Sequence, residues 1–224
     1  MLHGAIGAAD QLQPLAVALS PHFSVHTFSF SGHGGEPMPA ADFSIPLFAA
    51  DVLAYMQQHG LAQVSILGYS MGGYVAMYLA KYHPDKINKV LTLATKYLWT
   101  EEIAAREIQM LQPEKITQKL PAFAATLSAR HAPISWAAVL QKTTEMMVAL
   151  GASPTLSLHD FTTITTPSLL LLGDRDKMVS IEETIAVYKA LPNAQFGILP
   201  GTAHPIEQAD VSLLCFYACR FFLP

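Results

Sequence analysis

Short apolar runs alternate with longer segments of helical periodicity along most of this chain, and this alternation restricts the fold more than any other feature. The runs that predict strands are residues 22–30, 64–67, 87–94, 167–172 and 194–199. The segments that predict helices are residues 45–58, a run from residue 70 to the proline at 84, residues 181–191 and residues 208–222. Strands and helices in this order are typical of an α/β fold with a mostly parallel, doubly wound sheet.

The composition agrees with one globular domain and excludes several other classes of protein. Hydrophobic residues make up 51% of the 224 residues and charged residues 13%, which excludes a disordered, collagen-like or coiled-coil chain. The net charge of −4 argues against nucleic-acid binding, which needs a basic surface to neutralise phosphates. No apolar stretch reaches the length of about 18 residues that a membrane span needs. We expect no signal peptide, because Met1 runs directly into Leu2-His3-Gly4. We therefore expect a cytoplasmic protein with no nucleic-acid or membrane partner.

Residues 97–161 interrupt the alternation, because they contain several helical segments and no convincing strand. The segments are separated by Pro113, Pro121, Pro133 and Pro154. Insertions of this length between two strands are typical of functional lids, and ligands of open α/β sheets bind at the carboxyl edge that a lid would cover. We expect a core of residues 1–96 and 162–224 and a helical cap of residues 97–161. The alternative is an ordinary helical subdomain without a role at the site.

The segment Gly68-Tyr69-Ser70-Met71-Gly72-Gly73 lies between a predicted strand and a predicted helix. A nucleophile on such a sharp, strained turn needs small neighbours on both sides, and the turn lifts its hydroxyl clear of the sheet. The amide of Met71 would then face an oxyanion formed on the attacked carbonyl. The pattern therefore predicts that Ser70 is a nucleophile; the alternative is a glycine-rich turn that serves packing alone.

A serine hydroxyl needs a base, and the base needs a carboxylate to orient it. Asp174 and Asp176 follow one buried strand, and His204 follows the next strand along the chain. All three lie at strand carboxyl ends, as Ser70 does, and the order serine, acid, histidine is the order that this architecture uses. We expect His204 to be the base and either Asp176 or Asp174 to orient it.

These motifs resemble those of the α/β-hydrolase superfamily, and the resemblance extends from Leu2 to the final helix. Leu2-His3-Gly4-Ala5 is similar to the family's oxyanion loop, and residues 97–161 are similar to its helical cap. The resemblance implies that Ser70 is the nucleophile, His204 the general base and Asp176, rather than Asp174, the acid. It also implies an oxyanion hole formed by the amides of Ala5 and Met71, and structural roles for His3 and His33. The chain departs from the family before His3, where only Met1 and Leu2 stand in place of a strand hairpin; either upstream residues were lost or the sheet is shortened.

The resemblance implies a serine hydrolase that cleaves an ester, thioester or related acyl bond of a small, partly apolar substrate. Apolar cap residues that could form the acyl pocket are Trp99, Phe123, Trp136 and Met146, although each could equally belong to the core of the cap. Two alternatives stay open: a triad enzyme that hydrolyses carbon–carbon bonds, transfers acyl groups or acts as a lyase, and a ligand-binding receptor on the same scaffold. With two cysteines four residues apart, we expect no metal site and no cofactor. We expect a monomer or a homodimer whose partner is a small-molecule acyl substrate.

Overall fold

The computed structural model describes residues 1–223, and its centre is a parallel sheet of four strands in the order β1-β2-β3-β4. The strands are β1 (Val64–Tyr69), β2 (Ile87–Leu93), β3 (Ser168–Gly173) and β4 (Ala194–Leu199). Every residue of β3 is buried, because a central strand of a covered parallel sheet has no solvated face. Cα partners such as Leu67 with Leu91 and Leu91 with Leu169 continue the register across the sheet.

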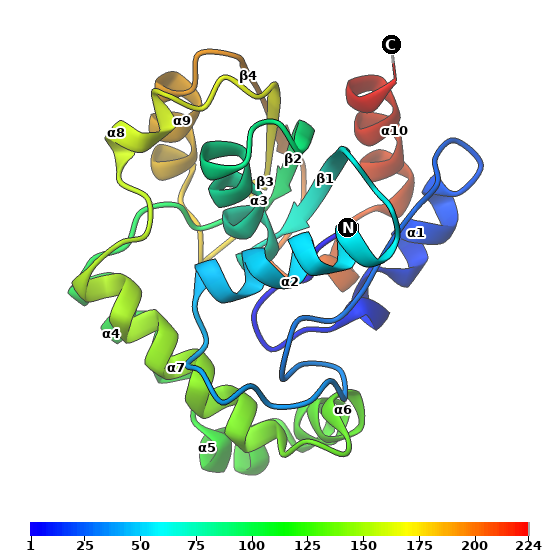
Figure 1. Cartoon of the computed structure of the whole chain (residues 1–224). Helices are drawn as coiled ribbons and strands as arrows, with labels where there is room; N and C mark the ends of the chain where they lie inside the picture. Colours follow the sequence, from blue (N-terminus) through cyan, green and yellow to red (C-terminus); the bar gives the residue numbers. More distant parts are fainter. Residues whose placement is uncertain (224) are drawn as a thin grey trace.

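Helices cover both faces of this sheet, so the predicted doubly wound α/β architecture is confirmed (Figure 1). On one face α2 (Ile45–Gln58), α3 (Met71–Tyr82) and α9 (Ile181–Ala190) bury their apolar side chains. On the other face α1 (Gln13–Leu19) packs beside α10 (Val211–Phe222). The short 3-10 helices η1 (Ala9–Leu12) and η3 (Ile206–Gln208) precede α1 and α10.

Local capping explains where these helices begin. The Ser44 hydroxyl accepts a hydrogen bond from the amide of Leu47 at 3.2 Å, and α2 therefore begins at the predicted residue 45. Ser180 and Glu183 form a reciprocal capping box at the start of α9. The last helix was predicted from residue 208, but it begins at 211 because the Asp210 carboxylate caps it through the amide of Leu213.

Residues 97–161 form helices without a strand, as predicted from the prolines. These are α4 (Glu101–Glu107), η2 (Ile108–Met110), α5 (Pro113–Lys119), α6 (Pro121–His131), α7 (Trp136–Ala152) and α8 (Leu158–Phe161). Helix α4 packs on α7 and α5 on α6, and Figure 1 shows these four helices grouped at one end of the molecule. None of the helices within residues 1–223 is both long and apolar enough to cross a membrane.

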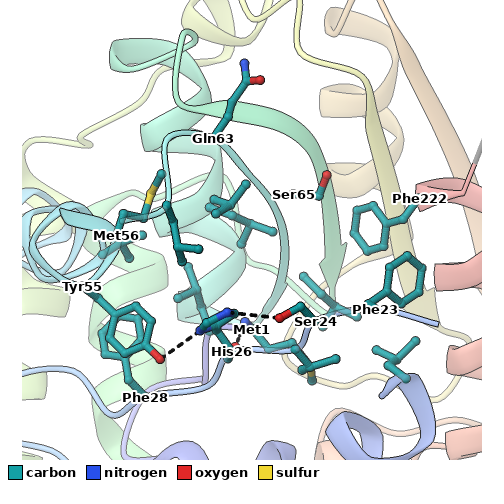
Figure 2. A pocket seen from close by; sticks show the side chains of 18 residues that line it. Met1, Phe23, Ser24, His26, Phe28, Tyr55, Met56, Gln63, Ser65 and Phe222 are labelled. Carbon is teal, nitrogen blue, oxygen red and sulfur yellow. Dashed lines mark hydrogen bonds between the residues drawn. The ribbon is translucent and has the colours of Figure 1, made fainter. Parts of the chain in front are cut away.

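The prediction of a strand at residues 22–30 is wrong. Residues 24–30 have no regular secondary structure and pair with no strand within residues 1–223, and a strand needs a neighbouring backbone to form a ladder. Among the residues that the structure describes, the only pairing on the outer side of β1 is an isolated parallel bridge between Leu2 and Gly68. A cavity of about 410 Å³ separates this segment from β1 (Figure 2).

Candidate active site

Three loops meet at the carboxyl edge of the sheet, because all four strands run parallel and end there. Ser70 follows β1, Asp176 lies three residues beyond the end of β3, and His204 lies five residues beyond the end of β4. The structure brings the three side chains into one hydrogen-bonded series, although 134 residues of sequence separate Ser70 from His204.

Ser70 occupies a backbone conformation that few residues other than glycine adopt, with φ at 50° and ψ at −116°. Such a conformation costs on the order of 1–3 kcal/mol and persists only where the surroundings enforce it. The Ser70 amide donates to the carbonyl of Leu93 at 2.8 Å, and the Thr95 hydroxyl donates to the Ser70 carbonyl at 3.1 Å. These two bonds fix the turn against the end of β2.

The turn also requires glycine on both sides of the serine. A Cβ atom on Gly68 would lie 2.4 Å from the carbonyl oxygen of Gly72, and one on Gly72 would lie 2.4 Å from that of Leu2. Both distances are shorter than any real Cβ contact, and backbone atoms cannot move aside as a flexible side chain can. Gly68 and Gly72 are therefore required for the packing of this strand-to-helix turn, independently of any chemistry at Ser70.

His204 lies between the other two groups. Its Nδ1 atom is 2.8 Å from Oδ2 of Asp176, and its Nε2 atom is 3.3 Å from the Ser70 hydroxyl oxygen. An ionised carboxylate only accepts hydrogen bonds, so Nδ1 carries the ring proton and donates a hydrogen bond to Asp176. In the neutral ring Nε2 is then an acceptor that faces Ser70. The Tyr69 hydroxyl donates to the His204 carbonyl at 3.1 Å and helps to hold the loop.

The carboxylate of Asp176 is fully buried and held from two sides. Its Oδ1 atom accepts hydrogen bonds from the amides of Met178 and Val179, at 2.8 and 2.9 Å. Burial alone raises the pKa of Asp176, but the hydrogen bond and charge of His204 and these two amides outweigh it and lower the pKa below its ordinary value. The group therefore stays ionised at neutral pH.

Asp174, the other candidate for the acid, does not share this environment. Its side chain is 35% exposed and lies 3.8 Å from the guanidinium of Arg175. Its backbone amide donates to the carbonyl of Leu199, which places it on the β4 side of the turn. Of the two aspartates, only Asp176 contacts His204.

The residues expected to form the oxyanion hole both line the cavity beside Ser70. Met71 is the first residue of α3, and Ala5 lies in the loop after Gly4. The first amides of a helix have no partner within it, and neither the Met71 nor the Ala5 amide donates to another group within residues 1–223. Two free amides thus border the space in front of the serine.

The cavity itself is small, with a volume of about 40 Å³. This is room for a few water molecules, whereas pockets for small ligands usually measure about 300–1,000 Å³. Its apolar wall comes largely from Tyr74, Trp99, Met146, Met147 and Leu150. A ligand of that size therefore fits only if the residues that line this cavity move apart.

Two of the four expected pocket residues do not reach this cavity. Trp99 and Met146 line it, but Phe123 is 39% exposed on α6. Trp136 packs against a separate apolar cluster that includes Leu127 and Leu140. The expectation is corrected for Phe123 and Trp136, because α5, α6 and α7 bury their apolar faces against one another.

Sequence reasoning missed three charged residues beside the site. Lys96 and Glu107 line the cavity, and Glu183 lies 3.7 Å from the Lys96 ammonium. A signal existed for Lys96, since it follows β2 at the same sheet edge as the other strand ends. Glu107 gave none, because a glutamate on a short helix is ordinarily solvated.

His3 and His33 are fully buried and contact backbone groups instead of the cavity. The His3 Nε2 atom accepts from the amide of Phe30 at 3.0 Å, and His33 Nδ1 lies 3.0 Å from the carbonyl of Ser31. Burial lowers the pKa of His33 to about 4 and that of His3 well below 6.5, so both rings are neutral. Within residues 1–223, no three His, Cys, Asp or Glu side chains are arranged so that they could hold a metal ion.

The larger cavity of Figure 2 contains none of the three hydrogen-bonded residues. It lies on the outer side of β1, where the Met1 amino group donates to the carbonyl of His26 at 2.6 Å. Burial lowers the pKa of this amino group to about 5. The small cavity, in contrast, is lined by Ser70 and His204 and bordered by the two free amides.

Comparisons with known proteins show similarity to hydrolases of one fold family. A family model described as alpha/beta hydrolase fold matches residues 1–150. The 2-(acetamidomethylene)succinate hydrolase of Mesorhizobium japonicum is 20% identical over 226 residues, covering 93% of this chain and 81% of that protein. The poly(3-hydroxyalkanoate) depolymerase of Ectopseudomonas oleovorans is 25% identical over 219 residues, covering 89% and 75%. The enol-lactonase structure from Burkholderia xenovorans LB400 superposes with a TM-score of 0.81 at 19% identity, covering 100% of this chain and 90% of that one.

Proposed function

Because the chain belongs to the alpha/beta-hydrolase family, we propose that it is a serine hydrolase acting on an ester, thioester or related acyl bond of a small, partly apolar substrate. The observation that carries the proposal is the series from Ser70 Oγ through the His204 ring to the buried Asp176 carboxylate. The three residues are of the types, and occur along the chain in the order, that acyl transfer through a serine requires in this architecture.

In the first half of the reaction, Ser70 Oγ attacks the carbonyl carbon while its proton passes to Nε2 of His204. The imidazolium that forms is stabilised by the charge of Asp176, and the oxyanion by the amides of Ala5 and Met71. The carbonyl then re-forms, the bond to the leaving group breaks, and His204 returns the proton to the departing oxygen or sulfur. The acyl group is left as an ester on Ser70.

In the second half, water takes the place of the leaving group. His204 Nε2 accepts a proton from the water as it attacks the acyl carbon, and the same two amides receive the second oxyanion. The Ser70 oxygen leaves, recovers its proton from His204 and releases a carboxylic acid. The cycle needs no group beyond the chain's own residues and water.

Two further features support this proposal. The depolymerase and the lactonase that the chain resembles are named for substrates that contain ester bonds. We further propose that residues 97–161 act as a cap over the core of residues 1–96 and 162–224, because α4 and α7 supply Glu107, Met146, Met147 and Leu150 to the cavity beside Ser70. An apolar wall suits the acyl side of the substrate.

The proposal is tested with a panel of p-nitrophenyl esters and matched thioesters of increasing acyl length, assayed with the wild type and with Ser70→Ala. We expect the wild type to hydrolyse at least one short member and Ser70→Ala to lose on the order of 10⁴ or more in kcat, since the nucleophile is gone. Binding of the esters without turnover would indicate a receptor instead. Turnover that survives in Ser70→Ala would exclude Ser70 as the nucleophile.

A further inference from the structure

Two residues that line the cavity beside Ser70 each carry a buried polar atom without a hydrogen-bond partner within residues 1–223. Glu107 is 3% exposed, and its Oε2 atom has no hydrogen-bond partner within residues 1–223. The Nε1 atom of Trp99 is also buried and has no partner there. Both residues line the cavity that Ser70 and His204 line. A buried polar atom left unpaired is destabilising, so two among the residues that line one small cavity require an explanation.

The charged groups next to Glu107 already have partners. Lys96 is 8% exposed; its ammonium donates to the carbonyl of Met178 and lies 3.5 Å from Oε1 of Glu107. Glu183, which also faces Lys96, accepts from the amide of Tyr97 at 2.9 Å. One acceptor, Glu107 Oε2, and one donor, Trp99 Nε1, therefore remain available.

The charges around the two atoms determine what kind of group can pair with them. A cation would be repelled by Lys96 and by the Arg106 guanidinium, whose Nη2 lies 3.5 Å from Glu107 Oε1. An anion would be repelled by the carboxylates of Glu107 and Glu183. A neutral hydroxyl fits, because it donates one hydrogen bond and accepts another.

We propose that the acyl part of the substrate carries a hydroxyl group that donates to Glu107 Oε2 and accepts from the Trp99 indole N–H. The inference rests on the proposed function, since the acyl group must lie in this cavity if Ser70 attacks its carbonyl carbon. It makes Glu107 and Trp99 specificity-determining residues and makes hydroxyacyl esters the substrate class. Solvent reaches neither atom, so binding involves a local shift of the Trp99 ring or of the end of α4.

The test uses two pairs of methyl esters that differ by a hydroxyl in place of a methyl group. One pair is 3-hydroxybutyrate and 3-methylbutyrate, and the other is 6-hydroxyhexanoate and heptanoate. We expect kcat/KM to favour the hydroxyl ester by about tenfold or more in at least one pair, because the apolar ester leaves both buried atoms unpaired.

Two variants assign that preference to the residues named. Glu107→Leu removes the acceptor and Trp99→Phe removes the donor, and each should lower the preference about fivefold or more. The matched controls are Glu102→Leu, at an exposed position of the same helix, and Trp136→Phe, at the chain's other tryptophan. Both controls should keep the wild-type preference. If Glu107→Leu fails to fold, as judged from its melting curve, Trp99→Phe decides alone.

The outcomes separate this inference from the proposed function. Ser70-dependent hydrolysis without a preference in either pair, or a preference that Trp99→Phe leaves intact, overturns the inference while the proposed function stands. If neither the four methyl esters nor any member of the p-nitrophenyl panel is hydrolysed in a Ser70-dependent way, the inference and the proposed function are both overturned.

Discussion

At the level of single residues, each group of the candidate site restricts the next. Two backbone amides hold one oxygen of Asp176, so the other oxygen faces His204. His204 Nδ1 donates a hydrogen bond to this second oxygen, so the ring proton is on Nδ1 and Nε2 can accept a hydrogen bond from Ser70. Ser70 in turn is held by the strained turn between β1 and α3. The chemistry proposed here depends on this order of contacts more than on any one distance.

This order predicts what an amide does in the acid position. In Asp176→Asn the side-chain oxygen should keep its bonds to the amides of Met178 and Val179, which turns the NH₂ group toward His204 Nδ1. Two donors cannot face each other, so the ring takes the tautomer that protonates Nε2, and Ser70 loses its base. We expect turnover of the best ester to fall by about 10⁴, the loss seen for this substitution in the serine-protease triad.

Asp174→Asn is the matched control, because it makes the same substitution two residues away on the same turn. Asp174 is partly exposed and contacts Arg175, so we expect its kcat/KM to stay within about threefold of the wild type. A larger loss in Asp174→Asn than in Asp176→Asn would reverse the assignment of the acid.

At the level of elements, three buried histidines join the loop that carries Ala5 to the rest of the molecule. His3 and His33 have ring centroids 5.2 Å apart, and those of His33 and His131 are 5.8 Å apart. His131, on α6, accepts from the amide of Gly34 and lies 3.0 Å from the carbonyl of Ile6. Helix α6 is thus tied to the loop that carries Ala5 through a neutral imidazole cluster.

This cluster should make the protein sensitive to acid. Burial lowers the pKa of His33 to about 4, whereas an unfolded histidine titrates near 6.5. Its contribution to stability is therefore complete above about pH 6.5 and is lost as the pH falls toward 4, since only the unfolded chain binds the proton there. For His33 alone, we expect the free energy of unfolding to fall by about 2 kcal/mol between pH 7.5 and pH 5.

Urea unfolding at the two pH values measures this loss. His33→Gln should reduce the difference between the two pH values, while His22→Gln, which changes an exposed histidine, should leave it unaltered. An equal pH dependence in the wild type and in His33→Gln would show that this ring does not carry the effect.

Elements differ in how far their own sequence determines them. Helix α2 and strand β4 have the predicted ends, because Ser44 caps the former and each carries its own period. Residues 22–30 have the composition of a strand but lack a partner, and pairing is not a local property. Phe123 and Trp136 were misplaced for a related reason: a helical period shows that a face is buried, but not which helix buries it.

At the level of the whole molecule, the alternation of strands and helices was sufficient to predict the sheet and to bring Ser70, Asp176 and His204 to one edge. That edge follows from the parallel topology alone, so residues more than 100 positions apart could be assigned to one site. Glu107 and Trp99 could not be assigned a polar role in this way, because their surroundings arise only when the end of α4 comes close to Lys96, which follows β2.

The most direct test of the proposed function is the reaction of the folded protein with a fluorophosphonate probe, followed by mass spectrometry of the labelled peptides. An activated serine beside two free amides reacts quickly with such a probe, whereas an ordinary serine does not. We predict a single adduct, on Ser70, that is absent from Ser70→Ala and forms far more slowly in Asp176→Asn. An adduct on any other serine, or no adduct on folded protein, would contradict the assignment of Ser70 as the nucleophile.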